Sequence, residues 1–285
     1  MGNKVLVTGI TGNVGYDVGK GLLKRSAKIK GAVRNPDKAR ETGLDGVEYV
    51  RFDFQDTSTY KEALKDVSKI FLMRPPQIAD PKSQVKPFIE EAKKKGVEQI
   101  VFLSLMGIEK NPIPPHYKIE KYIRESEIPY TFLRPSFFMQ NLNSTHCEDI
   151  RDRDDIFIPA GKSKSSFIDT RDIGEVGAIV LTEEEYKNKA YTLTGSEALD
   201  YYEVAKIFSE VLGRDIEYSN PSPLKFKKIM LQRGMDKDFV NVMVALYFTT
   251  RMGMAKKVTS ELEKLLKRKP TTVKQFIKDH VDCWV

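Results

Sequence analysis

Short apolar runs and amphipathic stretches alternate along the first half of the chain. The apolar runs are bounded by polar and turn-forming residues, which is typical of strands that are buried on both faces of a sheet. Between the runs, apolar residues recur at every third or fourth position, as they do in amphipathic helices. The predicted strands cover residues 4–8, 28–34, 48–53, 69–73, 99–104 and 130–135.

Two of the intervening stretches show the helical pattern clearly. One helix is predicted over residues 59–67, after the capping pair Asp56–Thr57, and another over residues 82–95, where Phe88, Ile89 and Ala92 fall on one face. Alternation of this kind predicts an α/β fold with a Rossmann-type, doubly wound parallel sheet. Ligands of such folds bind outside the carboxyl ends of the strands.

Directly after the first strand, the segment KVLVTGITGNVG (residues 4–15) carries Gly9, Gly12 and Gly15. The first glycine permits a tight turn, the second lets the backbone approach a phosphate, and the third lets helix and strand pack closely. The helix N-terminus behind them attracts anions. The segment therefore predicts a dinucleotide pyrophosphate site that includes Thr11, Asn13 and Val14, with a plain strand-to-helix turn as the alternative.

The end of the second strand points to the kind of dinucleotide. Arg34 stands where a site specific for NAD would carry an acidic residue, and its guanidinium suits the 2′-phosphate of NADPH instead. After the third strand, Asp53 is expected to accept a hydrogen bond from the adenine amine and Phe54 to cover the ring. The alternative for Arg34 is an exposed surface arginine. The alternative for Asp53 and Phe54 is that both are turn residues.

Other strand ends complete the predicted cofactor groove. Since ligands of parallel sheets bind at the carboxyl edge, the residues that end the fourth, fifth and sixth strands are expected to line the groove. These are Met73, Arg74, Pro75, Ser104 and Pro135.

After residue 135 the pattern becomes mainly helical. Helices are predicted over about 172–181, from the Asp200 cap to Gly213, and over 223–233, 237–249 and 272–280, with short strands at 191–194 and 216–218. We expect an NAD(P)-binding domain of residues 1–135, with residues 166–183 packing back onto it. Residues 136–165 and 184–285 form a smaller, mainly helical substrate-binding lobe, and Trp284 anchors the chain end.

Composition and charge exclude several classes of function. No apolar run reaches the ~18 residues of a membrane helix, and no signal-like segment precedes the first strand, so a cytoplasmic protein without a membrane partner is expected. The net charge of +7 is concentrated after residue 200, but no nucleic-acid-binding motif accompanies it. Cys147 and Cys283 are expected to be reduced structural thiols, and no metal-ligand spacing is present.

Several segments together resemble one family. VTGITGNVG, AVRNP, RFDFQD, HYKIEKYIRESEIPYTFLRPSFF, SFIDTRDIGEVGA and AYTLTGSEALDYYEVAKIFSEVLGRDIEY are similar to the NmrA-like, atypical branch of the short-chain dehydrogenase/reductases. Within that branch the chain resembles bacterial NADPH-dependent quinone reductases and triphenylmethane reductases. The resemblance extends over essentially the whole chain.

The usual catalytic pair of that family, Tyr-x-x-x-Lys, is out of register in this chain. Tyr117 and Lys121 match it literally, but counting back from Thr131 in IPYTFLRP places the lysine position of relatives at His116. The resemblance implies that His116 holds the nicotinamide ribose or the substrate, or donates a proton near neutral pH. The alternative is that His116 merely begins a helix behind two prolines.

The resemblance also implies roles for the segment after the sixth strand. Phe137 is expected to contact the nicotinamide, and Phe138 and Asn141 the substrate, with core packing as the alternative for both rings.

Two functions follow from these observations, and a third is disfavoured. The first is an NADPH-dependent oxidoreductase that transfers hydride to a quinone-like or conjugated small-molecule acceptor, since such an acceptor needs no placed acid. The second is a non-catalytic NADP(H)-sensing regulator of the NmrA type that acts through a protein partner. A sugar-nucleotide epimerase is disfavoured because alcohol oxidation needs a placed base. An oligomer is possible in each case.

Overall fold

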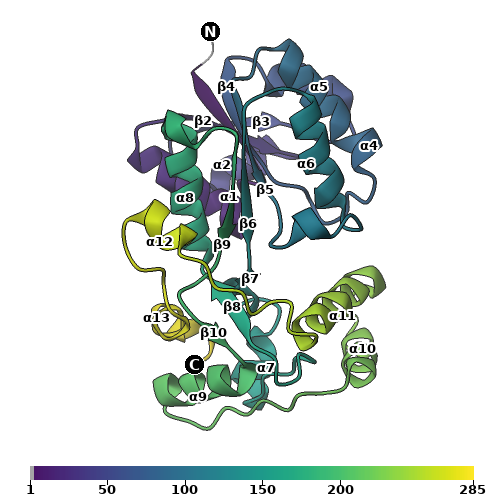
Figure 1. Cartoon of the computed structure of the whole chain (residues 1–285), viewed down its shortest axis with the longest axis vertical. Helices are drawn as coiled ribbons and strands as arrows, with labels where there is room; N and C mark the ends of the chain where they lie inside the picture. Colours follow the sequence, from purple (N-terminus) through teal and green to yellow (C-terminus); the bar gives the residue numbers. More distant parts are fainter. Residues whose placement is uncertain (1–2) are drawn as a thin grey trace. The chain divides into compact units, whose positions relative to one another are not determined.

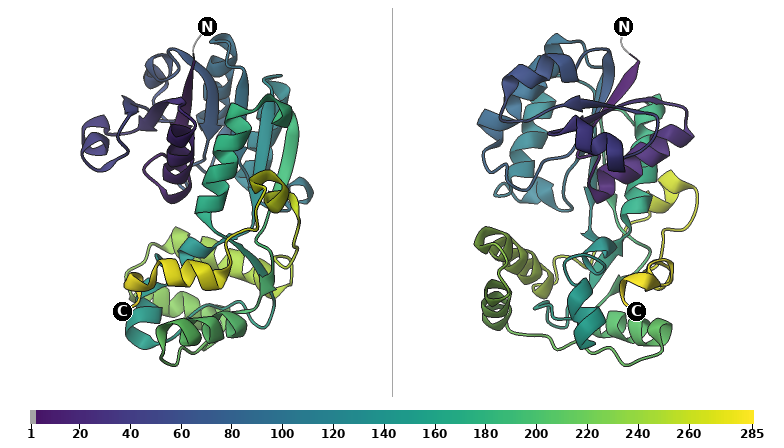
Figure 2. Two further views of the ribbon diagram at one scale, coloured as in Figure 1. Left: turned by 90° about the vertical axis from the view of Figure 1, so that its left-hand side faces the viewer. Right: turned by 180° about the vertical axis from the view of Figure 1, so that it is seen from behind.

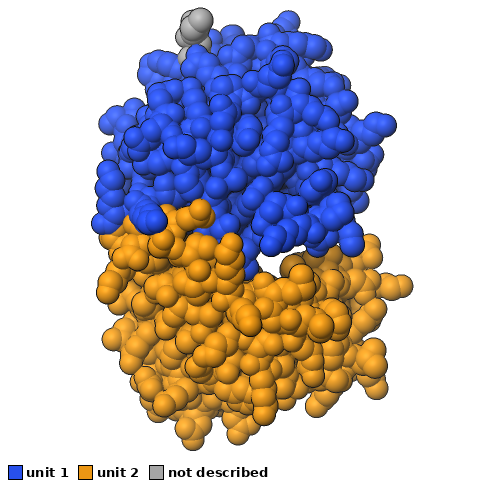
Figure 3. Space-filling view, in the orientation of Figure 1, with its two compact units in different colours: residues 1–135, 170–193, 264–267 blue, residues 136–169, 194–263, 268–285 orange. Residues whose placement is uncertain are grey.

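The computed structural model describes residues 3–285 and divides them into two compact units (Figure 3). Unit 1 comprises residues up to 135 together with 170–193 and 264–267. Unit 2 comprises residues 136–169, 194–263 and 268–285. The boundary at residue 135 coincides with the end of the sixth strand.

A seven-stranded parallel sheet forms the centre of unit 1, in the order β3-β2-β1-β4-β5-β6-β9 (Figure 1). Every neighbouring pair in this sheet is parallel, so the predicted Rossmann-type α/β fold is confirmed. The strands are β1 (Lys4–Thr8), β2 (Lys28–Val33), β3 (Val47–Arg51), β4 (Val67–Leu72), β5 (Gln99–Leu103), β6 (Tyr130–Pro135) and β9 (Lys189–Leu193).

Helices cover both faces of the sheet (Figures 1 and 2). On one face, small residues let α1 and α8 pack closely: a side chain at Gly177 would crowd Val18, and one at Gly21 would crowd Ala178. On the other face, Phe88, Ile119 and their neighbours form an apolar cluster with the strands. The helices of unit 1 are α1 (Asn13–Lys24), α2 (Pro36–Thr42), α3 (Tyr60–Ala63), α4 (Pro81–Gln84), α5 (Lys86–Lys94), α6 (Pro115–Glu125) and α8 (Thr170–Thr182).

The two predicted helices of the first half are shorter than expected. The helix expected over 59–67 is a 3-10 turn (Thr57–Thr59) followed by α3, because the chain leaves the helical conformation at Asp66 (φ 61°) and β4 begins at Val67. The helix expected over 82–95 is split into α4 and α5. Pro87 has no N–H to continue the helical hydrogen bonds at that point.

Unit 2 is mainly helical, around the small sheet β10-β8-β7. Asp200 and Glu203 form a capping box at the start of α9, and Gly213 ends it in the left-handed conformation, as the sequence predicted. Residues 216–218 form only a single bridge with Asp155, through Glu217, rather than the expected strand. The elements are β7 (Phe137–Phe138), β8 (Ser165–Ile168), β10 (Ala198–Leu199), α7 (Cys147–Arg153), α9 (Tyr201–Leu212), α10 (Pro223–Gln232), α11 (Lys237–Arg251), α12 (Glu261–Leu266), whose last residues belong to unit 1, and α13 (Val273–Asp279).

Two segments do not belong to the unit that the sequence predicted. Residues 166–168 belong to β8 of unit 2, because β8 pairs with β7 and β10. Residues 189–193, expected in the smaller lobe, form β9 of unit 1, because they pair in parallel with β6. Both segments were predicted to lie in the wrong unit, because the prediction relied on their neighbours in the sequence.

The end of the chain is fixed within unit 2. Trp284 is fully buried, its indole N–H donates to the Leu142 carbonyl at 3.3 Å, and Arg214 donates to the Trp284 carbonyl at 2.8 Å. This confirms the predicted anchor. Cys147 and Cys283 are both free, and the Cys147 thiol donates to the Cys283 carbonyl at 3.0 Å.

Candidate functional site

The three glycines after β1 differ in whether the fold requires a glycine at that position. Gly9 has a φ of +66°, which favours glycine, and a side chain at Gly15 would collide with the Gly9 carbonyl. Gly12 is different, since its φ of −99° suits any residue and an added Cβ would meet Gly9 O at 3.4 Å and Met73 Cε at 3.8 Å, which are ordinary contacts. The protein's own packing therefore does not require glycine at position 12, whereas close approach by a ligand would.

The N-terminus of α1 is open to an anion. Gly12 is its N-cap, and no side chain of the described chain caps the helix. Thr11 and Asn13 are exposed, while Val14 is buried under the first turn. The first N–H groups of a helix have no partners within it, and the helix dipole adds positive potential there. This end of α1 has the features that a pyrophosphate needs.

Arg34 follows β2 and is free to bind a ligand. Its side chain is exposed, and no hydrogen bond or ion pair occupies it within the described residues. Asn35 next to it caps α2 by accepting from the Lys38 N–H at 3.1 Å. A guanidinium without a protein partner is available for a phosphate, as the sequence prediction requires.

The two residues expected at the adenine differ in their surroundings. Asp53 is half-buried, and its Oδ1 accepts from the Gln55 N–H at 2.9 Å, so it has at least a turn-forming role. Phe54 is only 5% exposed and packs against Phe52 and Phe88 with ring centroids 4.7 and 5.7 Å away. The expectation that the Phe54 ring covers an adenine is therefore wrong, because this side chain belongs to the core.

The ends of β1 and β4 are joined at the carboxyl edge of the sheet. The Met73 N–H donates to the Thr8 hydroxyl at 2.7 Å, and the Met73 side chain fills the space beside Gly9. Arg74 follows and folds over the next loop, where its Nη1 donates to the carbonyls of Pro75 and Ile78 at 3.0 and 2.6 Å. Its Nε is buried without a partner, and burial lowers the pKa of this guanidinium.

His116 lies near Arg74, in the first turn of α6. Its ring stacks on Phe102 with centroids 5.8 Å apart, and its Nδ1 is buried without a partner. Burial, with a smaller contribution from the positive charge of Arg74, lowers the pKa of His116 to about 3. The imidazole is therefore neutral near pH 7, which favours holding the ribose or the substrate over donating a proton near neutral pH. A neutral ring remains able to form hydrogen bonds.

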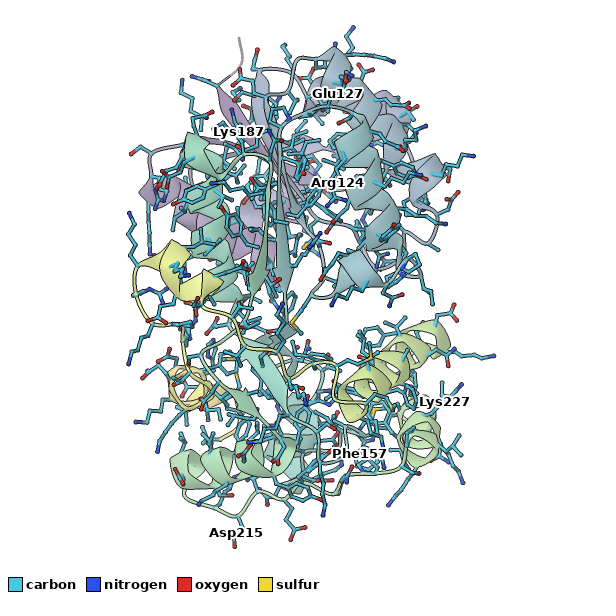
Figure 4. All side chains as sticks on the ribbon, viewed as in Figure 1. Arg124, Glu127, Phe157, Lys187, Asp215 and Lys227 are labelled. Atoms are coloured by element: carbon cyan, nitrogen blue, oxygen red, sulfur yellow. The ribbon has the colours of Figure 1, made fainter. Side chains whose placement is uncertain are left out.

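One helical turn after His116 lies a charge network that sequence reasoning missed. Glu120 is 2% exposed and accepts from the Ser104 hydroxyl at 2.7 Å and from Arg134 Nε and Nη2 at 2.9 and 2.7 Å. Arg124, labelled on α6 in Figure 4, adds a bond at 3.2 Å. The network joins the ends of β5 and β6 to α6. The feature of the sequence that could have indicated this network is that Glu120 lies on the same helical face as His116.

The literal Tyr-x-x-x-Lys match lies on the other side of this helix. Tyr117 is 38% exposed, and Lys121 is exposed and pairs with Glu125 at 3.7 Å. His116 and Glu120 lie on the inner face instead, and Glu120 is only 2% exposed.

Three predicted residues belong to unit 2. Phe137 is half-buried and stacks on Tyr247 with centroids 6.4 Å apart, which favours a packing role. Phe138 is also half-buried in β7, and Asn141 ends a 3-10 turn and accepts from the His146 N–H through its carbonyl at 3.0 Å. The other predicted residues, Pro135 at the end of β6 included, lie in unit 1.

Two hollows lie away from all predicted residues. One, of about 400 Å³, is lined by Tyr202, Lys206, Tyr218 and neighbours, and the other, of about 320 Å³, by Thr57, Tyr60, Pro87 and neighbours. Among residues 3–285, no group of His, Cys, Asp and Glu is arranged to hold a metal ion. No helix in that range is long and apolar enough to cross a membrane.

The chain is similar to known proteins over nearly its whole length. The model of the NmrA-like family matches residues 1–277. NAD(P)H azoreductase of Xenophilus azovorans is 32% identical over 97% of each chain, and quinone oxidoreductase 2 of Escherichia coli is 25% identical over 96% of this chain and 97% of its own. Triphenylmethane reductase of Citrobacter sp., solved with NADP(H), aligns with a TM-score of 0.87 at 27% identity, over 97% of this chain and 99% of that one. The resemblance read from the sequence is confirmed.

Proposed function

Because the chain belongs to the NmrA-like family, we propose that it is a reductase that uses NADPH to transfer a hydride to a quinone-like or other conjugated small molecule. The relatives reported above are named as reductases of azo compounds, quinones and triphenylmethane dyes. Their acceptors differ in structure but share a delocalised electron system.

The observation that carries this proposal is the carboxyl edge of the sheet in unit 1. Gly12 has no packing reason to be glycine, α1 begins without a side-chain cap, and Arg34 has no partner among the described residues. A pyrophosphate at α1 and a 2′-phosphate at Arg34 account for all three features. The site therefore fits NADPH better than NADH.

The class of acceptor follows from the missing catalytic pair. Tyr117 and Lys121 lie on the exposed face of α6, so this pair is not placed to protonate an alkoxide. A conjugated acceptor does not need that proton during hydride transfer, because the negative charge spreads over its own system. When bound, NADPH supplies the hydride, and water supplies the proton that completes a hydroquinone.

Arg74 and His116 are proposed to stabilise the charge that develops on the acceptor. The guanidinium stays positive despite its lowered pKa, because arginine does not lose its proton in proteins. The neutral His116 ring offers a hydrogen bond, and both side chains keep one buried nitrogen without a partner. Such preorganised groups are most effective where water is excluded. In unit 2, Phe138 and Asn141 are proposed to contact the acceptor.

Turnover with a panel of acceptors tests the proposal. The protein is mixed with NADPH and, in turn, with short-chain quinones, azo dyes and triphenylmethane dyes, and the loss of the nicotinamide absorbance is followed. We expect turnover with at least one class and slower turnover with NADH. Cofactor binding without turnover of any acceptor contradicts the proposal and favours the NADP(H)-sensing regulator.

A further inference from the structure

Exposed apolar side chains are concentrated on one part of unit 2. Of fourteen large hydrophobic residues that are exposed in the described chain, nine lie between residues 224 and 258. We call this part the α10–α11 surface. Its exposed apolar residues are Leu224, Leu231, Phe239, Val242, Leu246, Phe248, Met252, Met254 and Val258.

The two helices of this surface lie side by side in the different views (Figures 1 and 2). α11 uses Val240, Met243 and Tyr247 to join the core, and presents Val242 and Leu246 to solvent at 56% and 45% exposure. α11 therefore has an apolar stripe beyond the one that the core uses.

α10 has a similar arrangement. Phe226 and Met230 are buried, whereas Leu224 (82% exposed) and Leu231 are two turns apart on the outer side, with Lys227 between them. Figure 4 labels Lys227 on this helix. Apolar and cationic side chains thus alternate on the outer face of α10.

The same surface is strongly cationic. Residues 222–258 contain eight Lys and Arg but only two Asp. Of the eight cations, Arg233 pairs with Asp149 at 2.8 Å, and in the described structure the other seven have no ion pair. One of the two acids, Asp236, is used to cap α11. The seven free cations are Lys225, Lys227, Lys228, Lys237, Arg251, Lys256 and Lys257.

The charge excludes the simplest partners. In a two-fold dimer through this surface, the seven free cations of one copy would face those of the other, and like charges in an interface are costly. A typical protein partner is disfavoured as well, since lysine is depleted in protein–protein interfaces. The occupant must therefore carry negative charge and must accept inserted apolar side chains.

We infer that the α10–α11 surface docks on an anionic phospholipid surface. Basic amphipathic helices bind in the plane of such a surface, with their apolar side chains among the acyl chains and their lysines extended to the headgroups. From the sequence we expected no membrane partner, because no segment spans a bilayer. Docking on the surface needs no spanning segment, and it does not depend on the proposed reductase activity.

Co-sedimentation with vesicles tests this inference. The full chain is mixed with vesicles of equal parts phosphatidylglycerol and phosphatidylcholine, and separately with pure phosphatidylcholine. We expect at least about tenfold stronger binding to the anionic vesicles, decreasing with added salt because of screening.

Two sets of variants locate the binding surface. The triple change Lys225→Gln, Lys227→Gln and Lys228→Gln is expected to weaken binding about a hundredfold, since each cation contributes about 1 kcal/mol at an anionic membrane. The control removes three exposed lysines of unit 1 (Lys24→Gln, Lys28→Gln, Lys61→Gln) and should leave binding within about twofold.

The apolar contribution is tested separately. Val242→Ser with Leu246→Ser should weaken binding at least about tenfold through lost apolar insertion. Circular dichroism melting of each variant confirms that it is folded.

Three results would overturn the inference: equal binding to both kinds of vesicle, equal loss in the two lysine triples, or dimerisation that the Val242 and Leu246 changes abolish. Quinone turnover without vesicles reports on the proposed function alone, so the two failures are distinguishable.

Discussion

At position 12, a bound ligand would require glycine, but the fold does not. Space for a Cβ exists at Gly12 but not at Gly15. We therefore expect Gly12→Ala to fold with a free energy of unfolding within about 1 kcal/mol of the wild type, yet to bind NADPH at least about tenfold more weakly, equivalent to about 1.4 kcal/mol. Gly15→Ala is the matched variant and should lose about 3 kcal/mol of stability through overpacking. Calorimetry measures the NADPH affinity, and urea unfolding measures the free energy of unfolding. Unchanged NADPH affinity in Gly12→Ala would show that the ligand does not bind at this loop.

Arg34 is expected to select the cofactor. Arg34→Ala should raise the dissociation constant of NADPH by about 10- to 100-fold, because a charge-assisted hydrogen bond contributes about 1.5–3 kcal/mol, and should leave NADH binding unchanged. Titration calorimetry with both cofactors measures the difference. Arg40→Ala, an exposed arginine of α2 that pairs with Asp37, is the control and should alter neither affinity. Equal losses for NADPH and NADH would mean that Arg34 does not contact the 2′-phosphate.

His116 should influence turnover without titrating near neutral pH. Its pKa of about 3 keeps it neutral, so His116→Ala is expected to lower kcat/KM about tenfold by the same factor from pH 6 to pH 8. Tyr117→Phe, on the exposed face of the same helix, serves as control and should leave kcat/KM unchanged. A loss that grows or shrinks across this range would show that a proton on His116 takes part.

At the scale of residues, the sequence could predict what backbone geometry decides, such as the tight turn at Gly9 and the close packing at Gly15. Asp53 and Phe54 are neighbours, but one is half-buried at the edge and the other lies in the core, and the sequence does not show on which side a strand-end residue points. The neutrality of His116 depends on burial, which only the folded chain reveals.

At the scale of elements, strands were easier to predict than helices. A strand of a parallel sheet is buried on both faces, so its apolar run is visible in the sequence, and β6 (Tyr130–Pro135) has the predicted bounds. Helix lengths depend on single residues that end or interrupt them, as Pro87 does between α4 and α5. Strand β9 was assigned to the wrong unit because pairing partners distant in sequence leave no local signal.

The Glu120 network is expected to hold α6 against the sheet. Glu120→Gln should destabilise the protein by about 3 kcal/mol, because Arg134 keeps its charge at 9% exposure but loses its buried carboxylate partner, and only the more exposed Glu109 remains paired with it at 3.1 Å. Urea unfolding measures this change. Glu125→Gln on the same helix is the control and should cost less than about 0.5 kcal/mol, since its pair with Lys121 is exposed. Equal effects would show that the buried pair contributes no more than a surface pair.

At the scale of the whole molecule, acid should destabilise the fold through its buried histidines. His146 is 1% exposed, its Nε2 is 2.5 Å from the Tyr247 hydroxyl, and burial lowers its pKa to about 3. In the unfolded chain a histidine binds protons below its ordinary pKa of about 6.5. Stability is therefore complete above pH 6.5 and falls as the pH decreases towards 3, at up to about 1.4 kcal/mol per pH unit for each such histidine.

His146→Gln tests this prediction, because glutamine keeps a hydrogen-bonding group but does not titrate. Urea unfolding at pH 7.5 and pH 5 should show an acid loss that is about 2 kcal/mol smaller in the variant than in the wild type. The control variant is His280→Gln, at the end of α13, whose loss of stability between pH 7.5 and pH 5 is measured in the same way. The same acid loss in wild type and His146→Gln would show that His146 is not responsible.

Strand β9 has a consequence for how the chain is made. Its partner β6 ends at Pro135, but β9 begins only at Lys189, and the first part of unit 2 lies between them. During translation, the ribosome therefore releases β6 long before β9, and for that interval β6, which is buried in the folded protein, is an unpaired edge of the nascent sheet. Unpaired edges invite aggregation. Chaperones that shelter growing polypeptides should thus act on this chain until the last strand has emerged.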